Sequence, residues 1–240
     1  MIPRFFCPQA LPHSGAFELP KAVAHHAEKV LRLRVGAPLV LFSGDGREVE
    51  ARLLSVGRRC LVELHRWTVM ERESPLDTVL VQALASAEKM DWVIQKAVEL
   101  GVSAIQPVVA ERSVSRVSGE RAERRERHWR QVAISACEQS GRNRLPEIAP
   151  ITELAAWLGQ PRQTAPIVLR PDCPRGLAQL PGPGGTIFLL VGPAGGWSDR
   201  ELAMFDAARC VEVGLGPRVL RTETAGLAAL AAMQALWGDF

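Results

Sequence analysis

Residues 187–198 read Ile187-Phe-Leu-Leu-Val-Gly-Pro-Ala-Gly-Gly-Trp-Ser198, an apolar, β-prone run that ends in a glycine-rich turn. Residues 211–225 repeat this plan as Val211-Glu-Val-Gly-Leu-Gly-Pro-Arg-Val-Leu-Arg-Thr-Glu-Thr-Ala225. A run rich in alanine and leucine follows and predicts a closing helix. Each stretch therefore predicts a strand that feeds a loop, and loops at the ends of neighbouring strands can form one pocket.

Main-chain groups would hold a ligand in such a pocket. Glycine lacks a side chain and tolerates positive φ, so the backbone N–H and C=O groups of these loops can approach a ligand closely. An adenine or a ribose suits that environment. A triphosphate suits it poorly, because the Gly-Lys-Ser/Thr of a P-loop and the G-x-G-x-x-G spacing of a dinucleotide site are both missing. A plain turn explains the first loop equally well, but the second loop carries a polar cluster that favours a site: Arg218, Arg221, Thr222, Glu223 and Thr224.

The remaining elements predict two domains, a mostly β unit over residues 1–70 and an α/β unit over residues 71–240. The stretch 68–77 is charged, contains proline and lacks apolar periodicity, so it predicts the linker. Alternating strands and helices in the second unit predict a parallel sheet with helices on its faces. The expected strands are 39–42, 48–56, 60–64, 78–84, 102–109, 166–170, 187–191 and 211–213, the expected helices are 20–33, 88–100, 129–140, 152–158, 198–209 and 224–236, and 171–185 is expected to be a loop.

The composition is that of an ordinary folded chain. Of the 240 residues, 47% are hydrophobic and 23% are charged, which argues against disorder. The amino terminus lacks a signal-peptide pattern, and the longest low-polarity run is too short to span a bilayer, so we expect a cytoplasmic protein with no membrane segment. Five scattered cysteines and the pair His25-His26 lack the spacing of metal ligands or of a disulfide framework, so neither is expected.

Basic residues concentrate in one window although the net charge is only +3. Residues 111–130 contain seven arginines and four glutamates, a surplus of three positive charges. Such a surface can hold a phosphate backbone. Alternatively, these side chains pair at i,i+4 on one exposed helix, where each pair is worth only a few tenths of a kcal/mol.

The two glycine loops closely resemble the S-adenosylmethionine-binding loops of the RsmE family of SPOUT methyltransferases, which methylate N3 of a uridine in 16S ribosomal RNA. The resemblance spans nearly the whole chain. One departure concerns the family pattern Gly-Pro-Glu-Gly-Gly, in which Ala194 replaces the glutamate. The other anchors are Pro3-Arg4-Phe5-Phe6, His26 with Val30-Leu31-Arg32, Lys89 with Ile94-Gln-Lys-Ala-Val-Glu-Leu-Gly-Val102, Arg112-Ser113 and Glu138-Gln-Ser-Gly-Arg142.

The resemblance implies a SPOUT-type parallel sheet with a C-terminal trefoil knot around S-adenosylmethionine, preceded by a small PUA-like β-barrel that binds RNA. It also implies a homodimer in which the second subunit completes the pocket. The substrate would be 16S rRNA or the assembled small ribosomal subunit, and no metal would take part. The residue spacing by itself does not indicate a knot.

Individual roles follow from the resemblance and from the chemistry of uracil. We expect Arg221 to stabilise the negative charge that develops when N3 loses its proton, or else to fix the second loop, with Arg218 as the second candidate for the electrostatic role. Glu223 would orient an arginine or receive that proton, or else only stabilise the first turn of the last helix. The expected cofactor contacts are Leu169, Val191, Gly192, Pro193, Gly195, Gly196, Leu215, Gly216, Val219, Leu220, Thr222 and Ala225, and the expected RNA contacts are Arg4, Arg32, Arg34, Lys89, Arg112, Arg116, Arg142 and Arg218.

Two interpretations of Ala194 stay open. The family glutamate either shapes the loop and supports the next helix, a task that Asp199 and Glu201 of the predicted capping box Ser198-Asp-Arg-Glu201 take over here, or its loss weakens turnover or cofactor affinity. The second interpretation connects to an alternative function, a non-catalytic RNA-binding ribosome assembly factor of the same fold. A nucleotide-binding enzyme is a third possibility, which the missing lysine disfavours.

Overall fold

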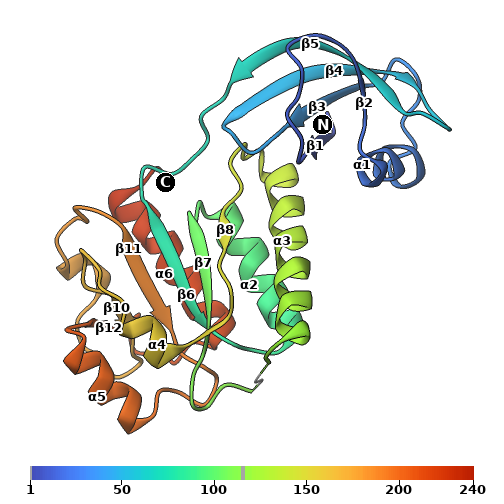
Figure 1. The fold of residues 1–240 in the computed structure, drawn as a ribbon. Helices are drawn as coiled ribbons and strands as arrows, with labels where there is room; N and C mark the ends of the chain where they lie inside the picture. Colours follow the sequence, from blue (N-terminus) through green and yellow to red (C-terminus); the bar gives the residue numbers. More distant parts are fainter. Residues whose placement is uncertain (1, 115–116) are drawn as a thin grey trace. The chain divides into compact units, whose positions relative to one another are not determined.

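The computed structural model describes residues 2–114 and 117–240, which form two compact units (Figure 1). Unit 1 contains the chain up to Glu73 together with Cys137–Leu145, and unit 2 contains Ser74–Ala136 and Pro146–Phe240. A segment from the middle of the sequence therefore belongs to the amino-terminal unit. The expected boundary at residue 70 assigns Cys137–Leu145 to the second domain, whereas this segment packs with unit 1.

Unit 1 is built on a five-stranded sheet with the order β1-β3-β4-β5-β2, in which only the β1–β3 pair is parallel. Alternate side chains of β4, such as Val49, Ala51 and Leu53, are buried, as expected for a sheet with one face on the core. The three strands predicted here are confirmed, whereas β1 and β2 are too short to show a pattern in the sequence. The strands are β1 (Arg4–Phe6), β2 (Gly15–Glu18), β3 (Pro38–Phe42), β4 (Arg47–Ser55) and β5 (Leu61–Val69).

The helix expected over 20–33 is shorter than predicted. It comprises α1 (Lys21–His25) and a π-helical segment, η1 (His26–Val30). Arg32 has a φ of 53°, a left-handed conformation that cannot continue a helix. The His26 ring packs edge-on against Phe5 at 5.5 Å between centroids, which is a packing role. The described residues contain no cluster of side chains suited to a metal ion.

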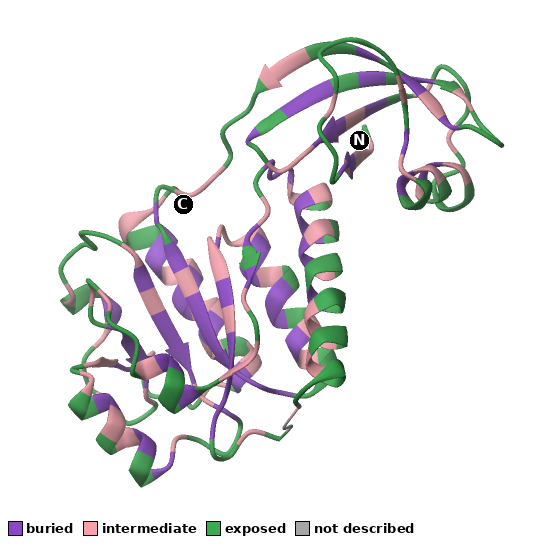
Figure 2. Ribbon diagram, viewed as in Figure 1, coloured by how far each residue is buried: buried purple, intermediate pink, exposed green. Residues whose placement is uncertain are grey.

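Unit 2 confirms the predicted parallel sheet. Its strand order is β12-β10-β11-β6-β7-β8, β9 pairs with β7, and every pair is parallel. The central strands are buried on both faces, which explains their nearly continuous apolar sequences (Figure 2). The strands are β6 (Thr78–Ala83), β7 (Ala104–Val109), β8 (Glu147–Ile148), β9 (Thr152–Glu153), β10 (Ile167–Leu169), β11 (Ile187–Val191) and β12 (Val211–Val213).

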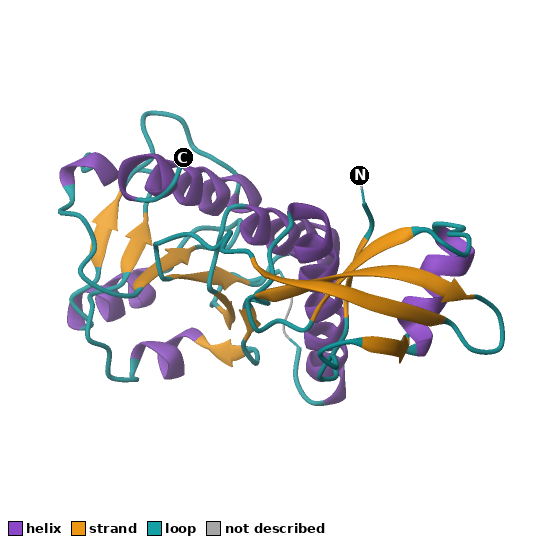
Figure 3. Cartoon of the chain, turned by 90° about the horizontal axis from the view of Figure 1, so that it is seen from above, coloured by secondary structure: helices purple, strands orange, loops and turns teal. Residues whose placement is uncertain are grey.

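Helices flank this sheet (Figure 3). The expected helix at 129–140 begins nine residues earlier, because the arginine- and glutamate-rich segment is helical and contributes an exposed Glu123–Arg127 pair at 3.6 Å. The connector 171–185 contains one 3₁₀ turn, η2 (Leu177–Gln179). The α-helices are α2 (Ala87–Glu99), α3 (Glu120–Ser140), α4 (Leu154–Leu158), α5 (Asp199–Ala207) and α6 (Thr222–Trp237).

Close packing of α6 against the sheet depends on a small residue. A Cβ at Gly226 would lie 3.1 Å from Val191 Cγ2 and 3.3 Å from Leu80 Cδ1. The amino end of α6 is thereby held against the ends of β6 and β11. No helix in the described ranges is both long and apolar enough to cross a membrane. The trefoil knot stays a prediction.

Candidate functional site

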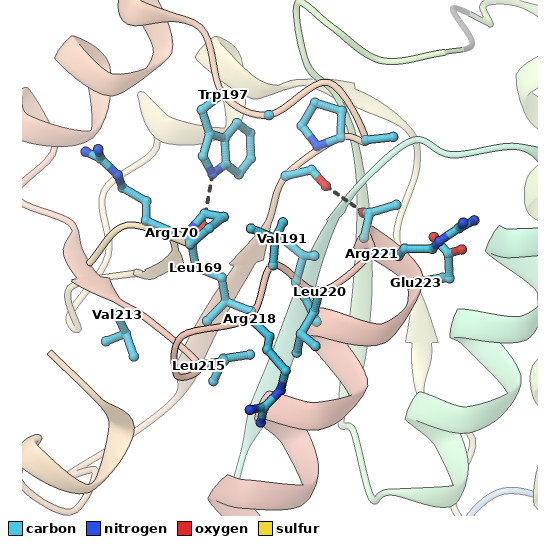
Figure 4. A pocket seen from close by; sticks show the side chains of 18 of the residues that line it. Leu169, Arg170, Val191, Trp197, Val213, Leu215, Arg218, Leu220, Arg221 and Glu223 are labelled. Carbon is cyan, nitrogen blue, oxygen red and sulfur yellow. Dashed lines mark hydrogen bonds between the residues drawn. The ribbon is translucent and has the colours of Figure 1, made fainter. Parts of the chain in front are cut away.

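A pocket of about 380 Å³ opens where the two glycine-rich loops meet, at the carboxyl ends of β10, β11 and β12 (Figure 4). This is the usual place for a ligand in an open parallel sheet. Loop 1 (residues 192–198) joins β11 to α5, and loop 2 (residues 214–221) joins β12 to α6. The pocket is lined by Lys89, Leu169, Arg170, Pro171, Val191, Gly192, Pro193, Ala194, Gly196, Trp197, Val213, Leu215, Arg218, Val219, Leu220, Arg221, Thr222, Glu223 and Ala225.

Ten of the twelve expected cofactor residues therefore line one pocket. The two exceptions, Gly195 and Gly216, belong to the same loops but do not contribute to the pocket wall. Apolar side chains make much of that wall, and Leu169, Val191 and Leu220 lie together in Figure 4. The structure therefore brings together, in one unit, residues that are more than fifty positions apart in the sequence.

Loop 1 is a hydrogen-bonded turn. The Gly196 N–H donates to the Pro193 carbonyl at 2.9 Å, and Gly196 has a φ of 71°, which favours glycine. Ala194 is exposed in this turn and lines the pocket. The Trp197 indole N–H donates to the Leu169 carbonyl at 3.3 Å, which ties loop 1 to the end of β10 (Figure 4).

The predicted capping box is present at the start of α5. Ser198 Oγ accepts from the Glu201 N–H at 3.1 Å, and Glu201 Oε2 accepts from the Ser198 N–H at 2.8 Å. The other oxygen of Glu201 accepts from the Glu111 N–H at 2.9 Å, and the residue is only 1% exposed. Glu201 thus supplies the carboxylate that supports this helix, as the first interpretation of Ala194 expects.

Arg112 holds loop 1 from outside. Its guanidinium donates to the carbonyls of Gly195 at 3.0 Å and Trp197 at 3.3 Å. Because Glu201 fixes the neighbouring Glu111 backbone, the segment after β7 and the turn of loop 1 form one hydrogen-bonded assembly. Arg112, predicted as an RNA contact, therefore has a structural partner in the pocket loop.

Loop 2 begins with a close backbone approach. The Gly214 N–H donates to the Arg175 carbonyl at 2.8 Å, and a Cβ at Gly214 would lie 2.1 Å from the Cys173 carbonyl oxygen. Any other residue would therefore displace the backbone here. The connector 171–185, expected only as a loop, thus positions the start of loop 2.

A hydrogen-bonded chain links the two loops to the centre of the sheet. Thr222 Oγ1 donates to the Gly192 carbonyl at 2.5 Å and accepts from Gln82 Nε2 at 3.0 Å. Gln82 is the penultimate residue of β6, is fully buried and also donates to the Ala83 carbonyl. The sequence prediction missed Gln82, and its one signal is a polar side chain inside an otherwise apolar strand.

An ion pair between α2 and α6 lies in the wall of the pocket. Lys89 Nζ lies 2.9 Å from Glu223 Oε1. Burial raises the pKa of the Glu223 carboxyl, but the hydrogen bond and charge of Lys89, with a contribution from Arg221, outweigh it and lower that pKa below its ordinary value. Glu223 is therefore an anion at neutral pH. The exposed Arg221 side chain lies beside it (Figure 4).

Sequence reasoning also missed several pocket residues. Arg170 follows β10 and pairs with Glu212 and Asp172, each at 2.7 Å, so its charge is compensated. Trp197 was quoted as part of loop 1 but not given a contact. No local pattern marks Arg170, Pro171 and Val213, because strand pairing brings them to the pocket, whereas Trp197 lies in loop 1 itself. The residues in this group are Arg170, Pro171, Trp197 and Val213.

Two of the arginines expected to contact RNA are held in ion pairs inside unit 1. The Arg4 side chain is 11% exposed, pairs with Glu48 at 2.5 Å and donates to Asn143 Oδ1. The Arg142 side chain is 6% exposed and pairs with Glu73.

The other expected RNA contacts differ in their surroundings. Arg32 and Arg34 are exposed in unit 1, and Arg218 is exposed at the pocket of unit 2. Lys89 lies in the pocket with Glu223. Arg116 falls outside the residues that the structure describes.

Residues 72–234 match the family model described as an RNA methyltransferase domain. The chain belongs to the RNA methyltransferase family. Residues 19–63 match the PUA domain of RNA methyltransferases, so the small amino-terminal unit also has its counterpart in this family.

Relatives of this RNA methyltransferase extend over its whole length. Ribosomal RNA small subunit methyltransferase E of Bacillus subtilis is 31% identical over 238 residues, which cover 94% of this chain and 92% of that protein. The crystal structure of ribosomal RNA small subunit methyltransferase E from Neisseria gonorrhoeae, bound to S-adenosyl methionine, is 40% identical, covers 100% of both chains and has a TM-score of 0.93. A methyltransferase of Legionella pneumophila, also in complex with that cofactor, is 33% identical with a TM-score of 0.96 and full coverage of both chains.

Proposed function

We propose that this protein transfers a methyl group from S-adenosylmethionine to the RNA of the small ribosomal subunit, and that its target is N3 of a uridine in 16S rRNA. The observation that carries this proposal is the convergence of loops 1 and 2 on one pocket at the carboxyl edge of the parallel sheet. Full-length relatives with the same fold hold S-adenosylmethionine, which supports the assignment of the ligand.

The pocket fits this methyl donor. Its volume of about 380 Å³ falls in the range of small-molecule sites. Leu169, Val191 and Leu220 offer apolar surface to an adenine, and the glycines of loop 1 leave backbone groups accessible for hydrogen bonds. No lysine lies in either loop to hold a triphosphate, so the site suits a nucleoside better than a nucleotide.

S-adenosylmethionine supplies an electrophilic methyl group, and the protein contributes mainly position and electrostatics. Correct placement of two reactants can lower a barrier by roughly 7–11 kcal/mol. Uracil N3 carries an imide proton, and its loss places negative charge on the flanking carbonyls. Arg221 stabilises that charge, and the Lys89–Glu223 pair holds the wall of the pocket beside it. Because N3 lies on the pairing edge, the target base must be unpaired before transfer.

The RNA partner and the assembly state are part of this proposal. The amino-terminal unit matches a PUA domain of RNA methyltransferases, which supports RNA as the substrate. We propose that the working form is a cytoplasmic homodimer and that it acts on 16S rRNA or on the assembled small subunit. The alternative of a non-catalytic assembly factor gains no support from the pocket, whose loops and walls are intact.

Labelled S-adenosylmethionine tests this function directly. We expect the protein to transfer label to small-subunit RNA. Reverse transcription should then stop at one uridine, because a methyl group on N3 blocks pairing. Reactions with naked 16S rRNA and with isolated subunits distinguish the two substrates. If label is transferred neither to naked 16S rRNA nor to isolated subunits, the proposal is refuted.

Arg221→Ala tests the assigned catalytic role. We expect this variant to bind S-adenosylmethionine with nearly unchanged affinity and to lose about 100-fold or more in single-turnover rate, the usual effect of removing one electrostatic group. Calorimetry measures the binding and rapid quench the rate. Undiminished turnover would show that Arg221 does not stabilise the reacting base.

A further inference from the structure

A second concave surface lies between α2 and α3 in unit 2. This groove has a volume of about 530 Å³ and shares no lining residue with the pocket of the proposed function. We propose that it binds one unpaired nucleobase of the RNA substrate, adjacent to the target nucleotide. The inference rests on the proposed function and extends it to substrate recognition. The lining residues are Glu88, Asp91, Trp92, Gln95, His128, Gln131, Val132 and Ser135.

Trp92 offers a stacking surface. Trp92 is 53% exposed, although large aromatic side chains are usually mostly buried, and it lines the groove. Lys96 Nζ lies 5.2 Å from the ring centroid, and its charge is compensated by Glu99 Oε1 at 2.7 Å. Single-stranded RNA is recognised largely by stacking of its bases on aromatic side chains, a contact that paired bases cannot make.

The floor of the groove can recognise the edge of a base. Asp91 Oδ2 lies 2.8 Å from His128 Nε2, whereas Asp91 Oδ1 is buried and has no hydrogen-bond partner among the described residues. Asp91 lines the groove, and its carboxylate can accept from an amino or imino group of a base. The amides of Gln95 and Gln131, in the same lining, both donate and accept.

The charges favour a base inside the groove and phosphates outside it. Glu88 and Asp91 would repel a phosphate that entered. His128, Gln131 and Ser135 follow each other at helical spacing on α3, and the same spacing toward its amino end reaches Arg124 and Arg121. Both arginines are exposed, so they can hold the phosphates that flank a bound base.

The groove begins beside the methyl-transfer pocket. Helix α2 starts just after the carboxyl end of β6, and Lys89 of its first turn lines the pocket while its neighbour Glu88 lines the groove. The chain also reaches α3 from the carboxyl end of β7. Helices α2 and α3 lie beside each other in unit 2 (Figure 1). A strand of RNA can therefore leave the pocket across α2 and place its next bases in the groove.

Steady-state methylation with varied RNA and saturating S-adenosylmethionine tests the groove. We expect Trp92→Ala to raise the KM for RNA about tenfold with unchanged kcat and unchanged affinity for the cofactor. Trp92→Phe, which keeps an aromatic face, should restore most of the affinity. Leu236→Ala removes an exposed apolar side chain elsewhere in unit 2 and should behave as the wild type.

A separate binding experiment keeps this inference distinct from the proposed function. A short single-stranded RNA that carries 4-thiouridine should crosslink to α2 or α3 in the wild type and much less in Trp92→Ala. If the wild type shows this crosslink but no methyl transfer, the proposed function fails and the groove stands. An unchanged KM and crosslink in Trp92→Ala refute the groove. Loss of dimers in sedimentation with unchanged RNA affinity would instead identify the groove as an interface between two copies.

Discussion

Thr222 lies where both pocket loops and the central strand of the sheet meet. Its hydroxyl accepts from Gln82 and donates to the Gly192 carbonyl, and the residue is only 7% exposed. A single side chain therefore fixes the start of α6 relative to loop 1. Residue-scale chemistry of this kind links the two loops that form the pocket.

Thr222→Val tests that link. Valine keeps the shape but leaves the Gly192 carbonyl and the Gln82 amide without this partner, so we expect a loss of about 1–3 kcal/mol in the free energy of unfolding. We also expect weaker binding of S-adenosylmethionine. Urea denaturation and calorimetry measure the two effects. Thr222→Ser, which keeps the hydroxyl, is the control, and equal loss in both variants would argue against the hydrogen bonds.

Lys89→Met tests the ion pair with Glu223. Because Lys89 holds the pKa of Glu223 below 4.5, the pair stabilises the folded protein above that pH, and the contribution disappears as falling pH protonates Glu223 in the folded state. The difference in urea midpoint between wild type and Lys89→Met should therefore be present at pH 7 and vanish at acidic pH. A difference that stays constant from pH 7 to pH 3 would contradict this assignment.

At the scale of elements, loop 1 is held by the segment that follows β7. Arg112 donates to two carbonyls of the loop. The Glu201 carboxylate accepts from the Glu111 N–H in the segment after β7 and from the Ser198 N–H in loop 1. Neighbouring segments thus support the conformation of this glycine-rich loop. Only glycine fits at Gly214 for a related reason, since the connector's carbonyl occupies the space of a Cβ.

Arg112→Met tests this support of loop 1. It keeps the aliphatic stem but removes both hydrogen bonds, so we expect the KM for S-adenosylmethionine to rise about 3- to 10-fold, with a smaller effect on kcat. Arg200→Met is the matched control, since Arg200 is also an exposed arginine near Glu111 but makes no hydrogen bond to loop 1 that the structure shows among its described residues. If both variants change KM equally, the effect is one of surface charge.

At the scale of the whole molecule, the two units are not two consecutive pieces of chain. Residues 137–145 complete unit 1, where the Phe6 N–H donates to Glu138 at 2.9 Å and Arg4 contacts Asn143. Burial raises the pKa of Glu48, but Arg4 and Asn143 outweigh this and lower it, which identifies Glu48 as a buried anion. Unit 1 therefore depends on sequence that lies inside the methyltransferase domain.

Arg4→Met tests that dependence. The change removes the closest cation from the Glu48 carboxylate and leaves Asn143 and the longer Arg72 contact at 3.4 Å, and loss of one partner of a buried ion pair usually costs about 3–5 kcal/mol. We expect lower stability to urea and faster proteolysis within unit 1. Binding of S-adenosylmethionine should be retained, because the pocket belongs to unit 2. Unchanged stability would show that residues 137–145 are held by packing alone.

The sequence by itself determined the features that depend on neighbouring residues. Apolar runs between glycines predicted the strands on which the pocket is built, and the Ser198–Glu201 spacing predicted a capping box, because these patterns act within a few residues. The resemblance to a family placed both loops in one site. The buried ion pairs of Arg4 and Arg142 could not be predicted from the sequence, because an arginine in a buried ion pair has the same local sequence as one on the surface.

Tertiary structure alone decided which distant residues meet. The Gln82–Thr222 contact joins positions 140 apart, Arg112 reaches loop 1 across 83 positions, and residues 137–145 join unit 1. The parallel sheet brings these groups together, because each strand carries its following loop to the same edge, and the strand order differs from the order along the chain. Local sequence patterns do not specify that strand order. The pocket could therefore be predicted from the sequence, but the distant side chains that stabilise it could not.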